Sequence, residues 1–203
     1  MRPGSSFSSR MAVLLLGFSF VCASCASSAS SRFYQLSSLK AGTAVSGKAT
    51  GKPVNIEIGP VRIPDYLDRP QIVTSNGKNE LELAEFDRWA GSLDEDIARV
   101  VAEDISALLP ADRFRVTPWS SWFAASPLYQ VEVNVIRFEG APGKSVLLKA
   151  QWTILDKQQG LRVHRESVIA EDVHGATYRA LVTAMSNALA GLSRAIAGSI
   201  TSL

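Results

Sequence analysis

Cysteine and histidine are scarce in this chain of 203 residues. Both cysteines, Cys22 and Cys25, lie near the N-terminus, and the only histidines are His164 and His174. The rest of the sequence therefore offers neither a disulfide framework nor the cysteine and histidine spacing of a zinc site. The composition accordingly predicts no metal and no cofactor.

Motifs that carry catalysis are also missing. The chain has no Gly-x-Ser-x-Gly elbow, no Walker loop and no dinucleotide fingerprint. His164 falls on an expected strand where it faces solvent, and His174 precedes an expected helix as a loop or capping residue. The acidic run 94–96 opens another expected helix and complements its dipole. We therefore expect a protein that is not an enzyme, and a hydrolase with an unfamiliar site is the least favoured alternative.

An excess of positive charge is absent once the N-terminal segment is set aside. The whole chain has 21 Lys and Arg against 19 Asp and Glu, and only Arg2 and Arg10 fall in the first 24 residues. Without that segment the two signs balance. A balanced charge gives no basis for nucleic-acid binding.

The first 24 residues have the three parts of a secretory signal peptide. Arg2 and Arg10 precede the apolar run Met11–Val21, and small residues follow it. This run is shorter than the about 20 apolar residues that span a bilayer. The segment therefore predicts export rather than a permanent membrane helix.

Cys25 makes this signal peptide resemble that of a bacterial lipoprotein. Ala23 and Ser24 fit a lipobox, in which cleavage leaves an acylated cysteine at the new N-terminus. Cys22 is the weaker acceptor, because the residues before it are bulkier. An ordinary cleaved signal with an incidental cysteine is the alternative. We expect a signal peptide over 1–24, a lipidated tether over 25–31 and one domain over 32–203.

Apolar periodicity divides the remaining chain into strands and two helices. The first helix begins near Phe86, or at Ser92 if Ser92 and Glu95 form a capping box, and ends before Pro110. The second spans about 176–200. Pro60, Pro64 and Pro70 predict an irregular connection. Alternation and turn residues predict strands over 32–36, 54–58, 71–74, 80–84, 114–116, 129–138, 145–155 and 161–169.

These elements predict an α+β fold. The last three strands are joined by short turns and so form an antiparallel meander. The hairpin over 71–84 and the other N-terminal strands extend the same sheet. We expect an antiparallel β-sheet, packed by the two α-helices.

Apolar residues in two polar or proline-rich segments are candidates for a contact surface. Tyr66 and Leu67 lie among prolines and charges, and Trp119, Trp122 and Phe123 lie in one short loop. Either the loop aromatics fold back as a lid on the core, or they contact a partner protein or lipid. We expect the lid role for Trp119 and the contact role for the other two.

Several of these segments together resemble the ABC-type transport auxiliary lipoproteins, the PqiC-like family. The most specific block is Tyr66-Leu67-Asp68-Arg69-Pro70-Gln71, with further similarity at Phe33-Tyr34-x-Leu36, at Arg88-Trp89-Ala90 and in the closing helix. The resemblance implies a lipoprotein held at the periplasmic face of the outer membrane by N-terminal acyl chains. It also implies a partner with an MCE domain and an inner-membrane transporter that together move lipid.

The residues leave the mechanism open between two classes. In the first, the protein is a docking component that uses Tyr66, Leu67, Asp68, Arg69, Trp122 and Phe123 to bind its partner or a second copy of itself. In the second, it is a lipid-binding module with its own cavity between helix and sheet. Extraction of lipid with the purified protein distinguishes the two.

Overall fold

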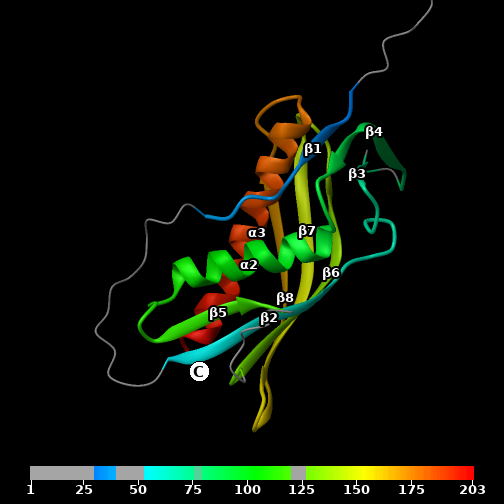
Figure 1. Cartoon of the computed structure of the whole chain (residues 1–203). Coiled ribbons are helices and arrows are strands. Elements are labelled where there is room, and N and C mark those ends of the chain that lie inside the picture. Colours follow the sequence, from blue (N-terminus) through cyan, green and yellow to red (C-terminus); the bar gives the residue numbers. More distant parts are fainter. Residues whose placement is uncertain (1–29, 40–52, 76, 78, 120–126) are drawn as a thin grey trace, which may run out of the picture. The chain divides into compact units, whose positions relative to one another are not determined.

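The computed structural model describes residues 30–39, 53–75, 77, 79–119 and 127–203, and residues 31–203 form one compact unit. The described residues of this unit form eight strands and two helices (Figure 1). In chain order they are β1 (Arg32–Tyr34), β2 (Val54–Arg62), β3 (Gln71–Ser75), β4 (Leu81–Trp89), α2 (Leu93–Leu108), β5 (Phe114–Pro118), β6 (Tyr129–Gly140), β7 (Ser145–Asp156), β8 (Gly160–Asp172) and α3 (Tyr178–Ile200).

The predicted meander is confirmed. Long strands β6, β7 and β8 pair in antiparallel order, with Val131 opposite Ile154 and Ile154 opposite Val163. Almost every second residue of β7 is buried, from Val146 to Asp156. This alternation follows from the period of two of a strand that buries one face.

The sheet as a whole is mixed, so the prediction of an antiparallel sheet is wrong, although the α+β class is confirmed. Strand β2 runs parallel to both β5 and β6, β1 runs parallel to β4, and β3 runs parallel to β6. Strands β2 and β5 are separated by the β3–β4 hairpin and α2. A connection of that length lets the chain return to the same end of the sheet before the next strand begins.

Strand β2 continues through Pro60, where the sequence predicts a break. The register of the β2–β6 pair shifts between Ile58 and Val61. At such a bulge a proline that cannot donate a ladder hydrogen bond is tolerated. The side-chain amide of Gln130 donates to the Gly59 carbonyl instead, at 2.9 Å.

Both helices pack on one face of the sheet. Ile58 on β2, Val131 on β6 and Ile154 on β7 lie side by side on that face and are fully buried. Helix α2 contacts β2 and β5, helix α3 contacts β7 and β8, and the helices contact each other (Figure 1). Alone, α3 is long and apolar enough to cross a membrane, but 67% of its most apolar window is buried in the fold, as in a core helix.

Helix α2 begins later than its apolar spacing alone predicts. Trp89 belongs to β4 and is buried there, and Ser92 is the N-cap. The Ser92 hydroxyl donates to the Asp94 carboxylate rather than capping a backbone N–H, so the capping box is not formed. Helix α3 begins after Thr177, whose hydroxyl oxygen accepts from the Ala180 N–H at 3.2 Å.

Candidate functional site

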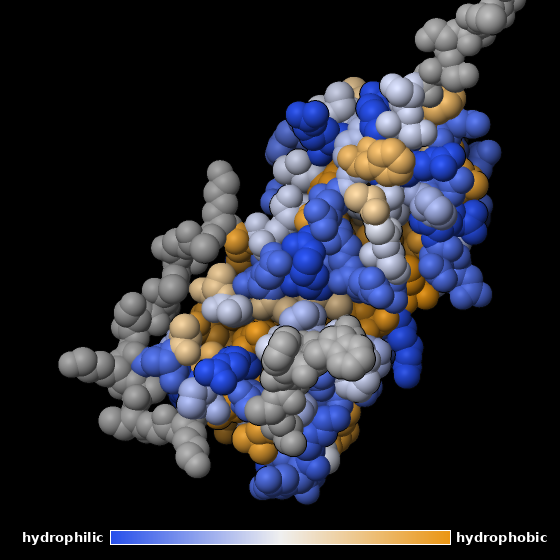
Figure 2. Space-filling model, in the orientation of Figure 1, coloured by the Kyte–Doolittle hydropathy of each residue, from blue (hydrophilic) through white to orange (hydrophobic). Residues whose placement is uncertain are grey.

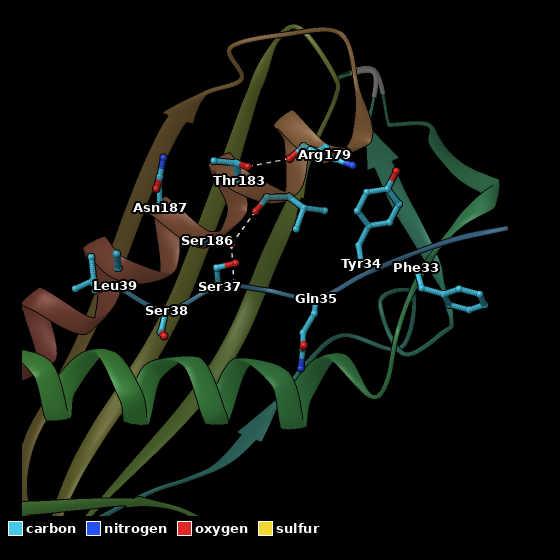
Figure 3. Close-up of a pocket in the computed structure, with 12 residues that line it drawn as sticks. Phe33, Tyr34, Gln35, Ser37, Ser38, Leu39, Arg179, Thr183, Ser186 and Asn187 are labelled. Carbon is cyan, nitrogen blue, oxygen red and sulfur yellow. Dashed lines mark hydrogen bonds between the residues drawn. The ribbon is translucent and has the colours of Figure 1, made fainter. Parts of the chain in front are cut away.

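The segment that follows β1 lies between the two helices, and we call its residues 35–39 the strap (Figure 3). Leu36 is buried in the core, so the strap is packed into the fold. Three of its backbone N–H groups donate to helix side chains: Leu36 to Asp96 Oδ2 (2.8 Å), Ser37 to Ser186 Oγ (3.1 Å) and Leu39 to Asp104 Oδ1 (2.6 Å). A segment without secondary structure thus satisfies its backbone donors on both helices.

Asp104 is the centre of this attachment. It is completely buried on α2, and its second oxygen, Oδ2, accepts from the Ser193 hydroxyl of α3 at 3.1 Å. One carboxylate therefore joins the strap, α2 and α3. Burial raises the pKa of Asp104 above the ordinary carboxyl value, although the Leu39 N–H and the Ser193 hydroxyl oppose the shift.

The guanidinium of Arg99 also holds the strap, by a bond to a backbone carbonyl. Arg99 on α2 donates from Nη2 to the Leu36 carbonyl at 2.8 Å and pairs with Asp96 and Glu103 of its own helix. Leu36 is therefore bonded through both its N–H and its C=O. The strap holds the start of the described chain firmly against the domain.

A groove of about 340 Å³ runs between the strap and α3. Tyr34, Gln35, Arg179, Thr183 and Asn187 are among the residues that line it, and Figure 3 shows them on β1, the strap and α3. Among the described residues no group of three or more metal-ligating side chains occurs. The lining of the groove includes hydrogen-bond donors and acceptors and one positively charged side chain, that of Arg179.

The turn that contains the Tyr-Leu-Asp-Arg-Pro block is fixed to β6 by a hydrogen bond. The Tyr66 hydroxyl donates to Glu139 Oε2 at 2.7 Å, and Glu139 is only 5% exposed. Arg137 pairs with the other carboxylate oxygen at 2.7 Å. Burial, and then the bond to Glu139, raise the pKa of the Tyr66 hydroxyl well above its ordinary value, so it remains a donor at neutral pH.

The four residues of this predicted contact surface, 66–69, differ in their exposure to solvent. Leu67 is 2% exposed and packs in the core, so its side chain is not available to a partner. Asp68 is exposed, and Tyr66 and Arg69 are half-buried. The surface at this turn is therefore narrower than the sequence indicates, with Asp68 and Arg69 as its charged part.

Arg69 has an unusual environment. Its Nε is buried and has no hydrogen-bond partner in the part of the chain that the structure describes. A buried donor that makes no bond costs stability, on the order of 1–3 kcal/mol. The Arg69 side chain therefore contributes little to the stability of the fold.

The structure places Trp119 differently from the predicted lid. It follows the end of β5, its N–H donates to the Ile58 carbonyl at 2.7 Å, and its side chain is 46% exposed. The lid prediction for Trp119 is therefore wrong: the backbone bond continues the pairing of β5 with β2, and the side chain is exposed and not part of the buried core. Trp122, Phe123 and Cys25 lie outside the described residues, so their roles stay predictions.

The bond from Tyr66 provides a first test. We expect Tyr66→Phe to lower the free energy of unfolding by about 1.5–2 kcal/mol, since it removes a hydrogen bond to a charged and nearly buried acceptor. Urea unfolding at neutral pH measures the change. Tyr129→Phe is the matched control, because the Tyr129 hydroxyl makes no hydrogen bond within the described chain, and it should cost less than about 0.5 kcal/mol. Equal losses for the two variants would show that the bond to Glu139 does not stabilise the turn.

Sequence reasoning missed Asp104 and the strap. Asp104 lies on the apolar stripe of α2, three residues after Val101 and one before Ile105. A carboxylate at a core-facing position of a helix is rarely buried without a partner. That pattern could have marked Asp104, but its partners Leu39 and Ser193 are 65 and 89 residues away.

Comparisons with known proteins give a family and a fold. A family model described as ABC-type transport auxiliary lipoprotein component matches residues 34–197. A crystal structure of an uncharacterized protein matches with a TM-score of 0.68 and 20% identity, over 84% of this chain and 99% of that one. A Xanthomonas campestris protein of the DUF330 family matches with a TM-score of 0.60 and 15% identity, over 84% and 94%. At these identities the two structures show a shared fold. No curated protein matches the chain.

Proposed function

The chain belongs to the family of ABC-type transport auxiliary lipoprotein components, and from this membership we propose an anchored docking role. The protein is held at the periplasmic face of the outer membrane by acyl chains on Cys25. There it is a component without catalytic activity of an MCE-type system that moves lipid between membranes. The observation that carries the proposal is the family match over residues 34–197, which covers the strap, the Tyr66 turn, α2 and all but the last three residues of α3.

The strap supports the anchoring part of the proposal. Leu36 is the first buried residue of the described chain and lies eleven positions after Cys25. The hydrogen bonds from the strap to both helices therefore resist any force that is applied to the N-terminus. Such an attachment suits a domain that works while it is tethered to a membrane.

The packed core favours a docking role over a lipid cavity. The space between α3 and the sheet is filled by large side chains that are at most 2% exposed, among them Trp152, Phe138, Leu181 and Met185. A bound lipid between helix and sheet would have to displace them. Transported lipid is then carried mainly by the partner proteins, with this chain as their contact.

Arg69 supports a docking surface at the Tyr66 turn. A guanidinium that makes no internal ion pair among the described residues, next to the exposed Asp68, is free to bind an acidic group of a partner. Arginine is also among the residues that dominate the energy of protein interfaces. The turn is fixed by Tyr66, so Arg69 is presented in one place.

Replacement of Arg69 tests this surface. We expect Arg69→Met not to lower the free energy of unfolding, and to raise it by up to about 1–3 kcal/mol, since it removes a buried Nε that makes no bond and keeps the apolar stem. Capture of the transport partner from solubilised envelopes should fall about tenfold or more, as for an interface hot spot. Co-purification followed by mass spectrometry, alongside urea unfolding, gives both numbers.

Arg115→Met is the matched control, because Arg115 is an exposed arginine on β5, away from the turn. It should change neither stability nor capture. Unchanged capture by Arg69→Met, or an equal loss with Arg115→Met, would remove the turn from the docking surface. A strong loss of stability with Arg69→Met would assign the side chain to the fold.

A further inference from the structure

Four large apolar side chains are exposed together at the end of the sheet formed by β1 and β4. Phe33 is 67% exposed, Leu83 51%, Leu81 44% and Phe86 41%. We call these four residues the apolar wing. Figure 2 shows apolar surface among polar residues beside β1 and β4.

Strand geometry places the four residues on one face. On β4 the residues Ala84, Asp87 and Trp89 are buried. The register of the β3–β4 pair shifts between Leu83 and Arg88, and a bulge there lets Ala84 and Asp87 lie on one face although they are three positions apart. Leu81, Leu83 and Phe86 alternate with these buried positions and so lie on the opposite face. On β1 the Tyr34 hydroxyl donates to Asp87 at 2.7 Å, so Tyr34 lies on the buried face and Phe33 on the opposite one. Phe33 pairs with Arg88, two positions from Phe86, which is within reach of aromatic side chains.

An apolar cluster of this kind on a monomer marks a surface that is covered in use. The cluster lies at the outer edge of the sheet, because β4 is the one strand that pairs with β1 among the described residues. The strap that follows runs back between the helices and leaves the wing uncovered in the described chain. The occupant is therefore none of the described residues.

The length of chain before β1 identifies that occupant. Phe33 lies eight residues after Cys25, and the residues 26–31 are only Ala and Ser. Eight residues reach at most about 29 Å when fully extended. If Cys25 is acylated, as the proposed function has it, β1 is the first folded element beyond the bilayer and cannot leave its neighbourhood.

We propose that the apolar wing rests on the lipid surface to which Cys25 is anchored. The tether keeps the wing at a high local concentration near the bilayer, so a modest apolar contact is sufficient. Arg88, which pairs with Phe33, and the exposed Glu85 lie beside the wing and carry opposite charges, so the wing has no excess charge of one sign for charged headgroups to bind. The surface therefore fits zwitterionic lipid. Acyl chains and wing together fix the orientation of the domain on the membrane.

The absence of cysteine beyond Cys25 allows a direct test on the full, acylated protein. Leu83→Cys is labelled with an environment-sensitive fluorophore, and the protein is reconstituted into phosphatidylethanolamine and phosphatidylcholine vesicles with nitroxide-bearing lipids. We expect a blue-shifted emission and loss of most of the fluorescence by nitroxide quenching. Leu161→Cys is the matched control. It is equally apolar and 63% exposed, and it lies next to the β7–β8 turn, at the end of β6–β8 away from the contact with β3.

The outcomes separate this proposal from the anchoring on which it rests. Protein that floats with the vesicles while the label at Leu83 is unquenched would overturn the wing contact and leave the anchor. Protein that does not float would overturn the anchor itself. A label at Leu83 that is shifted but unquenched, in a particle that sediments as more than one chain, would assign the wing to a second copy. Equal quenching at Leu83 and Leu161 would show contact without orientation and also overturn the proposal.

Discussion

Replacement of Asp104 by alanine is expected to lower the free energy of unfolding by about 3 kcal/mol at neutral pH. The change removes both acceptors of a completely buried carboxylate and leaves the Leu39 N–H and the Ser193 hydroxyl without their partner. It also empties part of the contact between α2 and α3. Urea unfolding of the domain measures the loss as a shift in the midpoint.

Asp104→Asn is the matched variant, because it keeps the shape and the bonds but removes the charge. Its carbonyl oxygen still accepts from the Leu39 N–H, and its amide can donate to the Ser193 hydroxyl oxygen. We expect this variant to be at least as stable as wild type at neutral pH. A loss as large as that of Asp104→Ala would show that the charge itself is needed, and would contradict the argument.

The pH dependence follows from the direction of the pKa shift. Burial raises the pKa of Asp104 in the folded chain above its ordinary value of 3.8, so the folded state binds this proton more tightly than the unfolded state. The stabilisation that comes from the proton on Asp104 is therefore complete below that ordinary value and is lost as pH rises through the raised pKa, while the hydrogen bonds to Leu39 and Ser193 remain. The stability of wild type relative to Asp104→Asn should thus fall as pH rises above the ordinary carboxyl value of 3.8. A constant or rising difference would contradict the assignment.

The parts of the fold that the sequence predicts are those governed by local periodicity. Strands β6, β7 and β8 alternate over their full length and are joined by short turns, so both their existence and their antiparallel pairing follow from neighbouring residues. Helix α3 is predicted for the same reason. Trp89 shows the limit, because its spacing from Leu93 imitates a helical turn across the Gly91–Ser92 break, where β4 ends.

Pairing between distant strands is not encoded in such patterns. The alternation of Val54–Ile58 shows that β2 has one buried face, but it does not say that its neighbours are β5 and β6 in parallel. That choice depends on how α2 packs across β2 and β5, which is a tertiary interaction.

The same limit applies to the candidate site, where conspicuous residues could be predicted but their packing could not. Tyr66 and Arg69 could be singled out because charged and aromatic residues in a proline-rich segment are conspicuous in any sequence. The burial of Leu67 between them depends on packing against the rest of the core, which no short segment reveals. The strap could not be predicted either, since its bonds join residues that are at least 60 positions apart.

Replacement of Cys25 by serine is expected to remove the protein from the outer-membrane fraction altogether. Cys25 is the proposed site of acylation, and two buried acyl chains contribute about 0.8 kcal/mol per methylene, enough for stable anchoring where one chain is not. Without the acceptor cysteine the precursor should remain uncleaved, or another peptidase should release a soluble periplasmic form. Fractionation of the envelope and the mass of the N-terminal peptide distinguish these products.

Cys22→Ser is the control for this change, since it removes the other N-terminal cysteine and leaves the residues on either side of the cleavage site intact. It should fractionate as wild type and retain an acylated N-terminal peptide that begins at Cys25. The apolar run before Cys25 is too short to span a bilayer, so the precursor alone does not reproduce a stable anchor. If Cys25→Ser fractionated with the outer membrane as wild type does, the attachment would have to come from the folded domain. The apolar wing would then be the first surface to test, because it could hold the domain on lipid without the acyl chains.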